Sequence, residues 1–137
     1  DLSGVNLTQA TLSQSNLSQT KLARAMVNQA NLFRVNFSKA SLVEVNLAEA
    51  NLSEADLTGA DLTNAFLYEA NLHRANLFKA NLEQANLSRA NMTQTDLTEA
   101  NLAYADVSLA NLSGANLRDA SLEGADLEGT VMPGGDN

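Results

Sequence analysis

The chain has 137 residues, and its 16 acidic and 8 basic residues give a formal net charge of −8. This length fits one domain, and the negative charge excludes direct nucleic-acid binding through an ordinary basic surface. Without cysteine there is no disulfide or thiolate chemistry, and since no apolar run is long enough for a membrane span, we expect a soluble protein, with the cytoplasm favoured and no membrane partner.

A five-residue repeat begins at the first residue of the chain. Divided into pentads, the sequence reads DLSGV, NLTQA, TLSQS and onward, with no insertion or deletion as far as Met132. Because Leu2 stands in register without a polar or helical cap, we expect the first repeat to present an unpaired edge. Two explanations stay open: the chain is a piece of a longer polypeptide, or it self-associates end to end at this N-terminal repeat.

An apolar residue marks the centre of each pentad, and 22 of the 27 centres are leucine. The residue before the centre is Asn or Asp in 20 of 27 pentads, and the residue two before it is Ala in 19 of 26. Leucines five residues apart would spread around every side of an α-helix and alternate between the sides of a flat strand. The backbone must therefore bend the same way in every pentad and coil around its leucines.

Each pentad is expected to contain a short extended segment followed by a corner. In that segment the small residue and the centre point inward, while the Asn or Asp between them points outward. The two residues after the centre then form the corner, and Ser or Thr occupies the first corner position in 13 of 27 pentads. Such residues are typical of turns.

Charges at the second corner position indicate how many pentads complete one coil, because opposite charges on stacked segments stabilise them by about a few tenths of a kcal/mol. At a spacing of 20 residues, opposite pairs outnumber like pairs by five to two, whereas at 15 residues like pairs outnumber opposite pairs by three to two. Four pentads per coil are therefore favoured. The five opposite pairs are Arg24 with Glu44, Arg34 with Glu54, Glu54 with Arg74, Glu69 with Arg89, and Lys79 with Glu99.

The repeat stops after Met132. The sequence continues with Pro133 and Gly134, and proline removes a backbone donor that a further rung would need. We therefore divide the chain into a repeat domain, 1–132, and a C-terminal tail, 133–137.

The motif A-[DN]-L-x-x, as in Ala50-Asn51-Leu52 and Ala60-Asp61-Leu62, resembles the repeat of the pentapeptide-repeat family over residues 1–132. The resemblance implies an all-β fold: a right-handed quadrilateral parallel β-helix, a solenoid with four pentads per coil and, for this length, about seven coils. Leucine-centred, alanine-rich members of the family are abundant in cyanobacteria, where they occur as single proteins and joined to signalling domains such as serine/threonine kinases.

Four pentads per coil assign every residue to one of four walls. Wall A is centred on Leu2, wall B on Leu7, wall C on Leu12 and wall D on Leu17, each with every twentieth residue after it and the corner that follows. The net charges of walls A to D are −3, −4, +1 and −2. Two adjacent acidic walls, A and B, are thus expected to lie opposite two more balanced ones.

Two strips of outward apolar residues are candidate contact surfaces for a protein partner. Clustered aromatic side chains beside charges are typical of protein interfaces, although scattered apolar surface residues are also normal. The first strip, on the acidic side, consists of Val43, Phe66, Tyr68, Tyr104 and Leu109. The second strip, whose pattern recurs after forty residues, consists of Phe33, Arg34, Lys39, His73, Arg74, Phe78 and Lys79.

No residue pattern indicates catalysis, a cofactor or a metal. His73 is expected at an exposed corner without an acid or nucleophile beside it. The outward aspartates fall in positions that Asn usually fills, so we expect them to bond the local backbone rather than calcium. They are Asp1, Asp56, Asp61, Asp96, Asp106 and Asp126. The corner glycines are interpreted as turn residues.

The sequence therefore predicts a non-enzymatic protein-binding or scaffold module for an unidentified protein partner. It is expected to serve as an accessory or regulatory domain of a larger signalling protein such as a serine/threonine kinase. The alternative is a DNA mimic that modulates gyrase, because the resemblance extends to quinolone-resistance members of the family. Those members have largely phenylalanine centres, interrupting loops and a C-terminal dimerising helix, which this sequence does not match.

Overall fold

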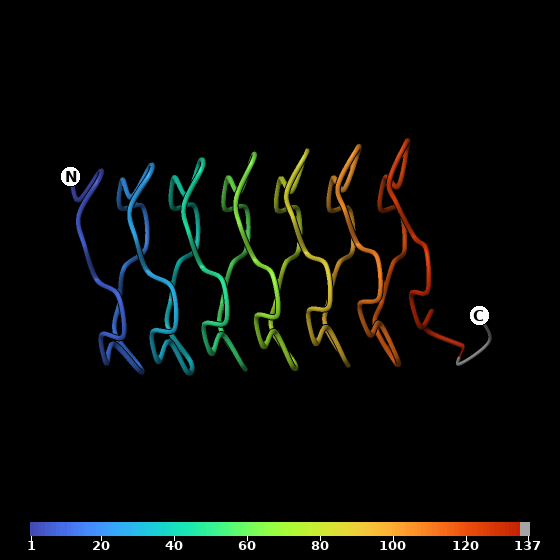
Figure 1. The fold of residues 1–137 in the computed structure, drawn as a ribbon, viewed down its shortest axis with the longest axis horizontal. Helices are drawn as coiled ribbons and strands as arrows, with labels where there is room; N and C mark the ends of the chain where they lie inside the picture. Colours follow the sequence, from blue (N-terminus) through green and yellow to red (C-terminus); the bar gives the residue numbers. More distant parts are fainter. Residues whose placement is uncertain (135–137) are drawn as a thin grey trace.

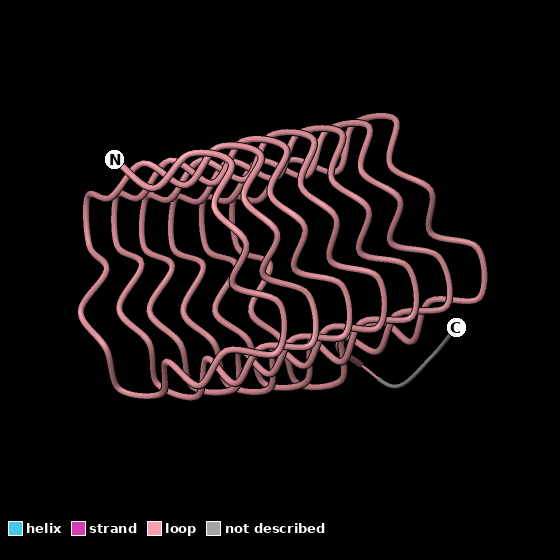
Figure 2. Cartoon of the chain, turned by 60° about the vertical axis from the view of Figure 1, so that its left-hand side comes forward, coloured by secondary structure: helices cyan, strands magenta, loops and turns pink. Residues whose placement is uncertain are grey.

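The computed structural model describes residues 1–134, which form one elongated coil. Successive turns of the coil follow one another along its long axis, from the N-terminus at one end toward the C-terminus at the other (Figure 1). Residues 1–134 contain no helix and no continuous strand, and the turns lie parallel and side by side (Figure 2). Part of the predicted tail, 135–137, falls outside the described residues.

Each outward residue forms a parallel β-bridge with the residue 20 positions later. The series runs from Asn6 with Met26 to Asn111 with Val131, on every wall of the coil. Four pentads therefore complete one turn, as the charge pairs predicted. Because the corner begins directly after the centre of each pentad, one bridge is all that a wall of one turn accommodates, and the expected extended segments remain single bridges rather than strands.

The pentad from Asn46 to Ala50 shows where the backbone donors go. The N–H of Asn46 donates to the preceding turn, to the carbonyl of Ala25, at 3.0 Å. Two donors bond the following turn instead: Leu47 to the carbonyl of Phe66 at 2.7 Å and Glu49 to the carbonyl of Tyr68 at 2.8 Å. The N–H of Ala50 donates within the pentad, to the carbonyl of Leu47 at 3.1 Å. The fifth, the N–H of Ala48, donates to the Asn46 side chain at 3.0 Å. All five N–H groups of this pentad are satisfied, which offsets their removal from water.

The corners are β-turns with a left-handed residue at the second corner position. In 21 of them this residue is not glycine, yet its φ lies between 54° and 61°. A positive φ at this place is the signature of a type II turn, and each non-glycine residue that adopts it costs about 1–2 kcal/mol. The prediction of corners is confirmed, but their left-handed backbone was not predicted.

The leucine and alanine side chains fill the inside of the coil. From Leu22 to Leu112 every pentad centre is fully buried, and Val27, Phe37 and Met92 fit the same interior. Thr95 replaces an inward alanine and remains satisfied, because its hydroxyl donates to the carbonyl of Met92 at 2.8 Å. Toward both ends the centres become partly exposed, because a neighbouring turn covers them on one side only.

Candidate protein-interaction surfaces

Residues 1–134 enclose no pocket and bring together no group of three or more metal-binding side chains. In the same part of the chain, no helix is long and apolar enough to cross a membrane. The places where this coil can engage another molecule are therefore its outer walls and corners, and their side chains are described in turn.

The outward Asn and Asp side chains are largely occupied by their own backbone. Asp61 is typical: its Oδ1 accepts from the N–H of Thr63 at 3.1 Å and from the Thr63 hydroxyl at 2.6 Å. All six outward aspartates accept such a bond from the residue two positions later, which confirms their predicted role. Where another residue replaces Asn or Asp, the first corner N–H loses this acceptor.

Side chains at the second corner position lean toward the following turn of the coil. The Arg24 guanidinium donates to Glu44 at 2.8 Å, and the Arg74 guanidinium donates to Gln94 at 2.8 Å. The amide of Gln9 likewise donates to Gln29 at 3.1 Å. We call the second-position residues stacked along one corner a corner column. Because nearly the same φ recurs at every corner, the Cα–Cβ bonds within a column point the same way, toward the following turn.

This direction determines which of the five opposite-charge pairs form an ion pair. The three pairs whose cation comes first are confirmed: Arg24 with Glu44 at 2.8 Å, Arg34 with Glu54 at 2.7 Å, and Lys79 with Glu99 at 3.4 Å. Within residues 1–134, the two pairs whose acid comes first form no ion pair. They are Glu54 with Arg74 and Glu69 with Arg89. The Arg74 guanidinium donates instead to Gln94 of the following turn.

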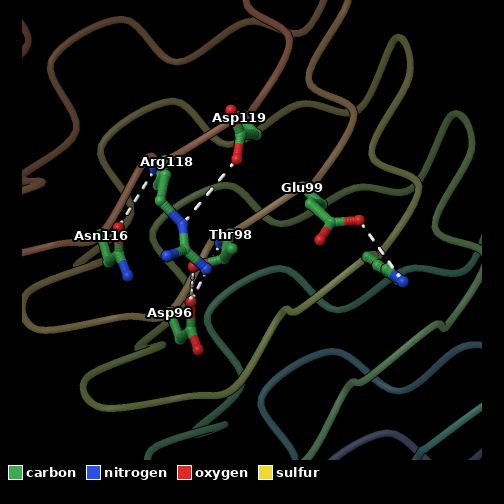
Figure 3. Close-up of polar contacts among 7 residues, drawn as sticks. Asp96, Thr98, Glu99, Asn116, Arg118 and Asp119 are labelled. Atoms are coloured by element: carbon green, nitrogen blue, oxygen red, sulfur yellow. Dashed lines mark hydrogen bonds and ion pairs between the residues drawn. The ribbon is translucent and has the colours of Figure 1, made fainter.

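The corner between walls D and A shows the paired state in detail (Figure 3). Glu99 receives the ammonium group of Lys79 from the preceding turn. Its successor in the column, Asp119, has an acid behind it instead, and the adjacent Arg118 pairs with it at 3.8 Å. At this corner both acids therefore have a cationic neighbour.

The residues of the first candidate strip lie on wall B and on the corners at its two edges. Phe66 and Tyr68 lie together on wall B and its corner, with 50% and 37% of their surface exposed. Val43 is half-buried and lies at the corner between walls A and B, as Tyr104 does. Met26, which the sequence analysis did not single out, is 43% exposed in the same outward column as Phe66, two turns away.

Tyr104 and Leu109 lie over glycines of the following turn. A Cβ atom added at Gly124 would stand 2.5 Å from the Tyr104 ring, and one added at Gly129 would stand 2.6 Å from Leu109. Each side chain therefore fills the space that a corner residue would otherwise take. A glycine 20 residues after a large apolar corner residue was the sequence signal for this packing, and reading the glycines as turn residues alone missed it.

The second candidate strip is largely satisfied within the chain. The guanidinium of Arg34 lies 4.9 Å above the Phe33 ring, and the ammonium of Lys79 lies 5.0 Å above the Phe78 ring. Both cations also form the ion pairs described above. His73 is half-buried, where the sequence predicted an exposed side chain, because its Nδ1 lies 2.7 Å from the Thr93 hydroxyl of the following turn.

The repeat is recognised by the family model described as pentapeptide repeats, which matches residues 1–38, 40–77, 75–114 and 95–134. The chain belongs to the pentapeptide-repeat family. Its structure is similar to that of Rfr23, a pentapeptide repeat protein from the cyanobacterium Cyanothece 51142, with 31% identity and a TM-score of 0.71 over 94% of this chain and 88% of that one.

A second similarity concerns the fold alone. QnrB1, a plasmid-mediated fluoroquinolone resistance protein, aligns with 17% identity and a TM-score of 0.57 over 99% of this chain and 86% of that one. No curated protein sequence matches this chain. Wall B differs from the other walls in having two large, exposed apolar side chains at outward positions, Met26 and Phe66.

Proposed function

We propose that this pentapeptide-repeat protein is a non-enzymatic protein-binding module that contacts its protein partner through wall B. The observation that carries the proposal is Phe66. Its ring is half exposed, and nothing in the packing of the coil requires it, because the inward positions of this pentad are Ala65 and Leu67.

Phe66 also removes a hydrogen bond from the coil. At most outward positions an Asn or Asp oxygen accepts the N–H two residues later, as Asn71 accepts from His73 at 3.1 Å. A phenyl ring offers no such acceptor to the N–H of Tyr68. The pentad thus exposes an apolar ring to water and lacks a hydrogen bond of about 0.5–1.5 kcal/mol. Phenylalanine at this position therefore does not favour folding, whereas an exposed aromatic ring is suited to binding.

The experiment compares Phe66→Asn with the wild-type chain. The variant restores the repeat and its local hydrogen bond, so it is expected to fold at least as well. Partners retained on immobilised wild-type protein should be lost from this variant and kept by the control Phe33→Ser, which alters the second strip. Retention of the same partners by Phe66→Asn would overturn the proposal.

The finer features of the prediction extend this proposal. The repeat domain spans 1–132 as a right-handed quadrilateral β-helix of about seven coils, supported by the register of 20 residues, and 133–137 form a tail. We place the module as an accessory domain of a signalling protein such as a serine/threonine kinase.

Chains are also proposed to associate end to end at the first repeat, which sedimentation analysis tests.

A second candidate function rests on the charge of walls A and B, −3 and −4. An acidic rod with the fold that QnrB1 also has is a candidate DNA mimic that modulates gyrase. A supercoiling assay with purified gyrase tests this function directly. Unchanged supercoiling at micromolar concentrations of this protein would remove it.

A further inference from the structure

The corner between walls B and C differs from the other three corners of the coil. Each of the other corners holds at least one ion pair, whereas in residues 1–134 none lies at this one. Its second-position column reads Gln29, Glu49, Glu69, Arg89 and Leu109 along the coil. The column is therefore charged but not internally neutralised.

The direction of the corner columns explains why Glu69 has no cation. A corner acid is reached by the side chain 20 residues before it, which for Glu44 is Arg24. For Glu69 that residue is Glu49, another acid, whose own carboxylate accepts from the amide of Gln29 at 3.4 Å. Two like charges on successive turns destabilise the column slightly, by about a few tenths of a kcal/mol.

The acids at this corner also affect the side chain of Tyr68, which precedes Glu69 in the chain. Its pKa is raised, first by the side-chain interaction of the phenol with Glu69, then by desolvation and by the charges of Glu69 and Glu49, which disfavour a phenolate. Arg89 opposes this effect only in part. Further along wall B, the outward residues Asp106 and Asp126 add negative charge.

We propose that the partner on wall B is a cationic segment of another protein, in which an Arg or Lys side chain meets Glu69 and Glu49 while a neighbouring apolar side chain covers Phe66. This inference rests on the proposed function and adds the chemistry of the partner. The exposed ring and the unneutralised acids lie on the same wall, so one extended segment reaches both. A second copy of this chain is a poorer fit, because its net charge is −8 and four of its eight cationic side chains are already in ion pairs.

The test measures binding of a synthetic peptide of alternating Arg and Leu residues to the full chain by fluorescence anisotropy. Phe66→Asn should weaken binding roughly tenfold or more, as loss of an interface anchor does. Glu69→Gln should weaken it about two- to fivefold, as loss of an exposed ion pair does, and added salt should reduce that difference. The control Glu99→Gln removes the same charge from the corner between walls D and A and should leave binding unchanged.

Four outcomes would overturn the inference. Equal weakening by Glu69→Gln and Glu99→Gln would mean that the peptide responds to net charge alone. Equal binding of a peptide of alternating Glu and Leu would mean that charge plays no part. Self-association that Phe66→Asn abolishes, measured by sedimentation, would make a second copy the occupant. If instead partners are lost from Phe66→Asn while the cationic peptide fails to bind, the proposed function stands and the cationic partner is refuted.

Discussion

Walls B and C of this coil have the same interior and different outer surfaces. Leu67 under wall B and Leu72 under wall C are both fully buried. Outside, wall C carries a column of asparagines from Asn31 to Asn111, in which the Asn91 amide donates to Asn71 at 3.2 Å and the Asn71 amide to Asn51 at 3.4 Å. Wall B interrupts its column with Met26 and Phe66. The repeat thus determines the inside everywhere, whereas the outer residues differ from wall to wall.

The largest effect expected is one that does not distinguish the two walls. Leu67→Ala and Leu72→Ala each remove a buried leucine side chain and should lower the free energy of unfolding by about 2–5 kcal/mol. Chemical denaturation of the two variants should give values that agree within error. A much smaller loss for one of them would show that the interior is not equivalent under the two walls.

Next in size is the substitution of corner glycines. Gly129→Ala, on the corner between walls B and C, places a left-handed alanine against Leu109 and should cost about 1–2 kcal/mol or more. Gly114→Ala, on the corner between walls C and D, meets the Gln94 side chain at 3.4 Å and should incur the backbone cost alone. Thermal unfolding would contradict the packing of Leu109 if Gly114→Ala were the more harmful change.

Substitutions in the outward columns of walls B and C should change the free energy of unfolding by smaller amounts and in opposite directions. Phe66→Asn restores an acceptor for the N–H of Tyr68 and should raise the free energy of unfolding by about 0.5–1.5 kcal/mol. Asn71→Phe, its counterpart on wall C, removes the acceptor of the His73 N–H and interrupts the amide column, so it should lower stability by a similar amount. Destabilisation by both changes would mean that Phe66 contributes to folding.

The smallest expected effect is a shift in the pKa of Tyr68, which a titration measures. In a Tyr104→Phe background, absorbance should show the phenol of Tyr68 losing its proton at a higher pH than a free tyrosine. Glu69→Gln should lower this pKa, because it removes the hydrogen bond and charge that raise it. Since the folded-state pKa is the higher one, the associated stability is present below the unfolded-state pKa and is lost as the pH rises through the folded-state value. An unchanged pKa in Glu69→Gln would contradict the contact.

Much of the fold could be predicted because every pentad has the same arrangement of apolar and polar residues and therefore must bury the same positions. A centre such as Leu52 must be buried, and a five-residue period leaves a coiled backbone as the solution. The direction of the corner columns could not be predicted, since it follows from a left-handed φ at residues such as Arg74 and Glu69, which are not glycine. For that reason the sequence did not indicate which of the five opposite pairs would form ion pairs.

The candidate surfaces were less predictable than the fold. Phe66 and Tyr68 were singled out because aromatic residues interrupt a polar pattern, and the structure places them together on wall B. Met26 was missed because its exposure becomes apparent only once the outward column is traced as a unit. The charged second strip was predictable as a pattern, but its internal pairing depends on side-chain geometry that a sequence does not specify.

The central claim is that Phe66 serves binding rather than folding. It is tested most directly by measuring the free energy of unfolding and the affinity for the cationic peptide on the same preparations of wild-type and Phe66→Asn protein. The account predicts that the variant is at least as stable as the wild type and binds the peptide roughly tenfold more weakly or worse. A variant that is less stable and binds the peptide as tightly as the wild type would contradict it.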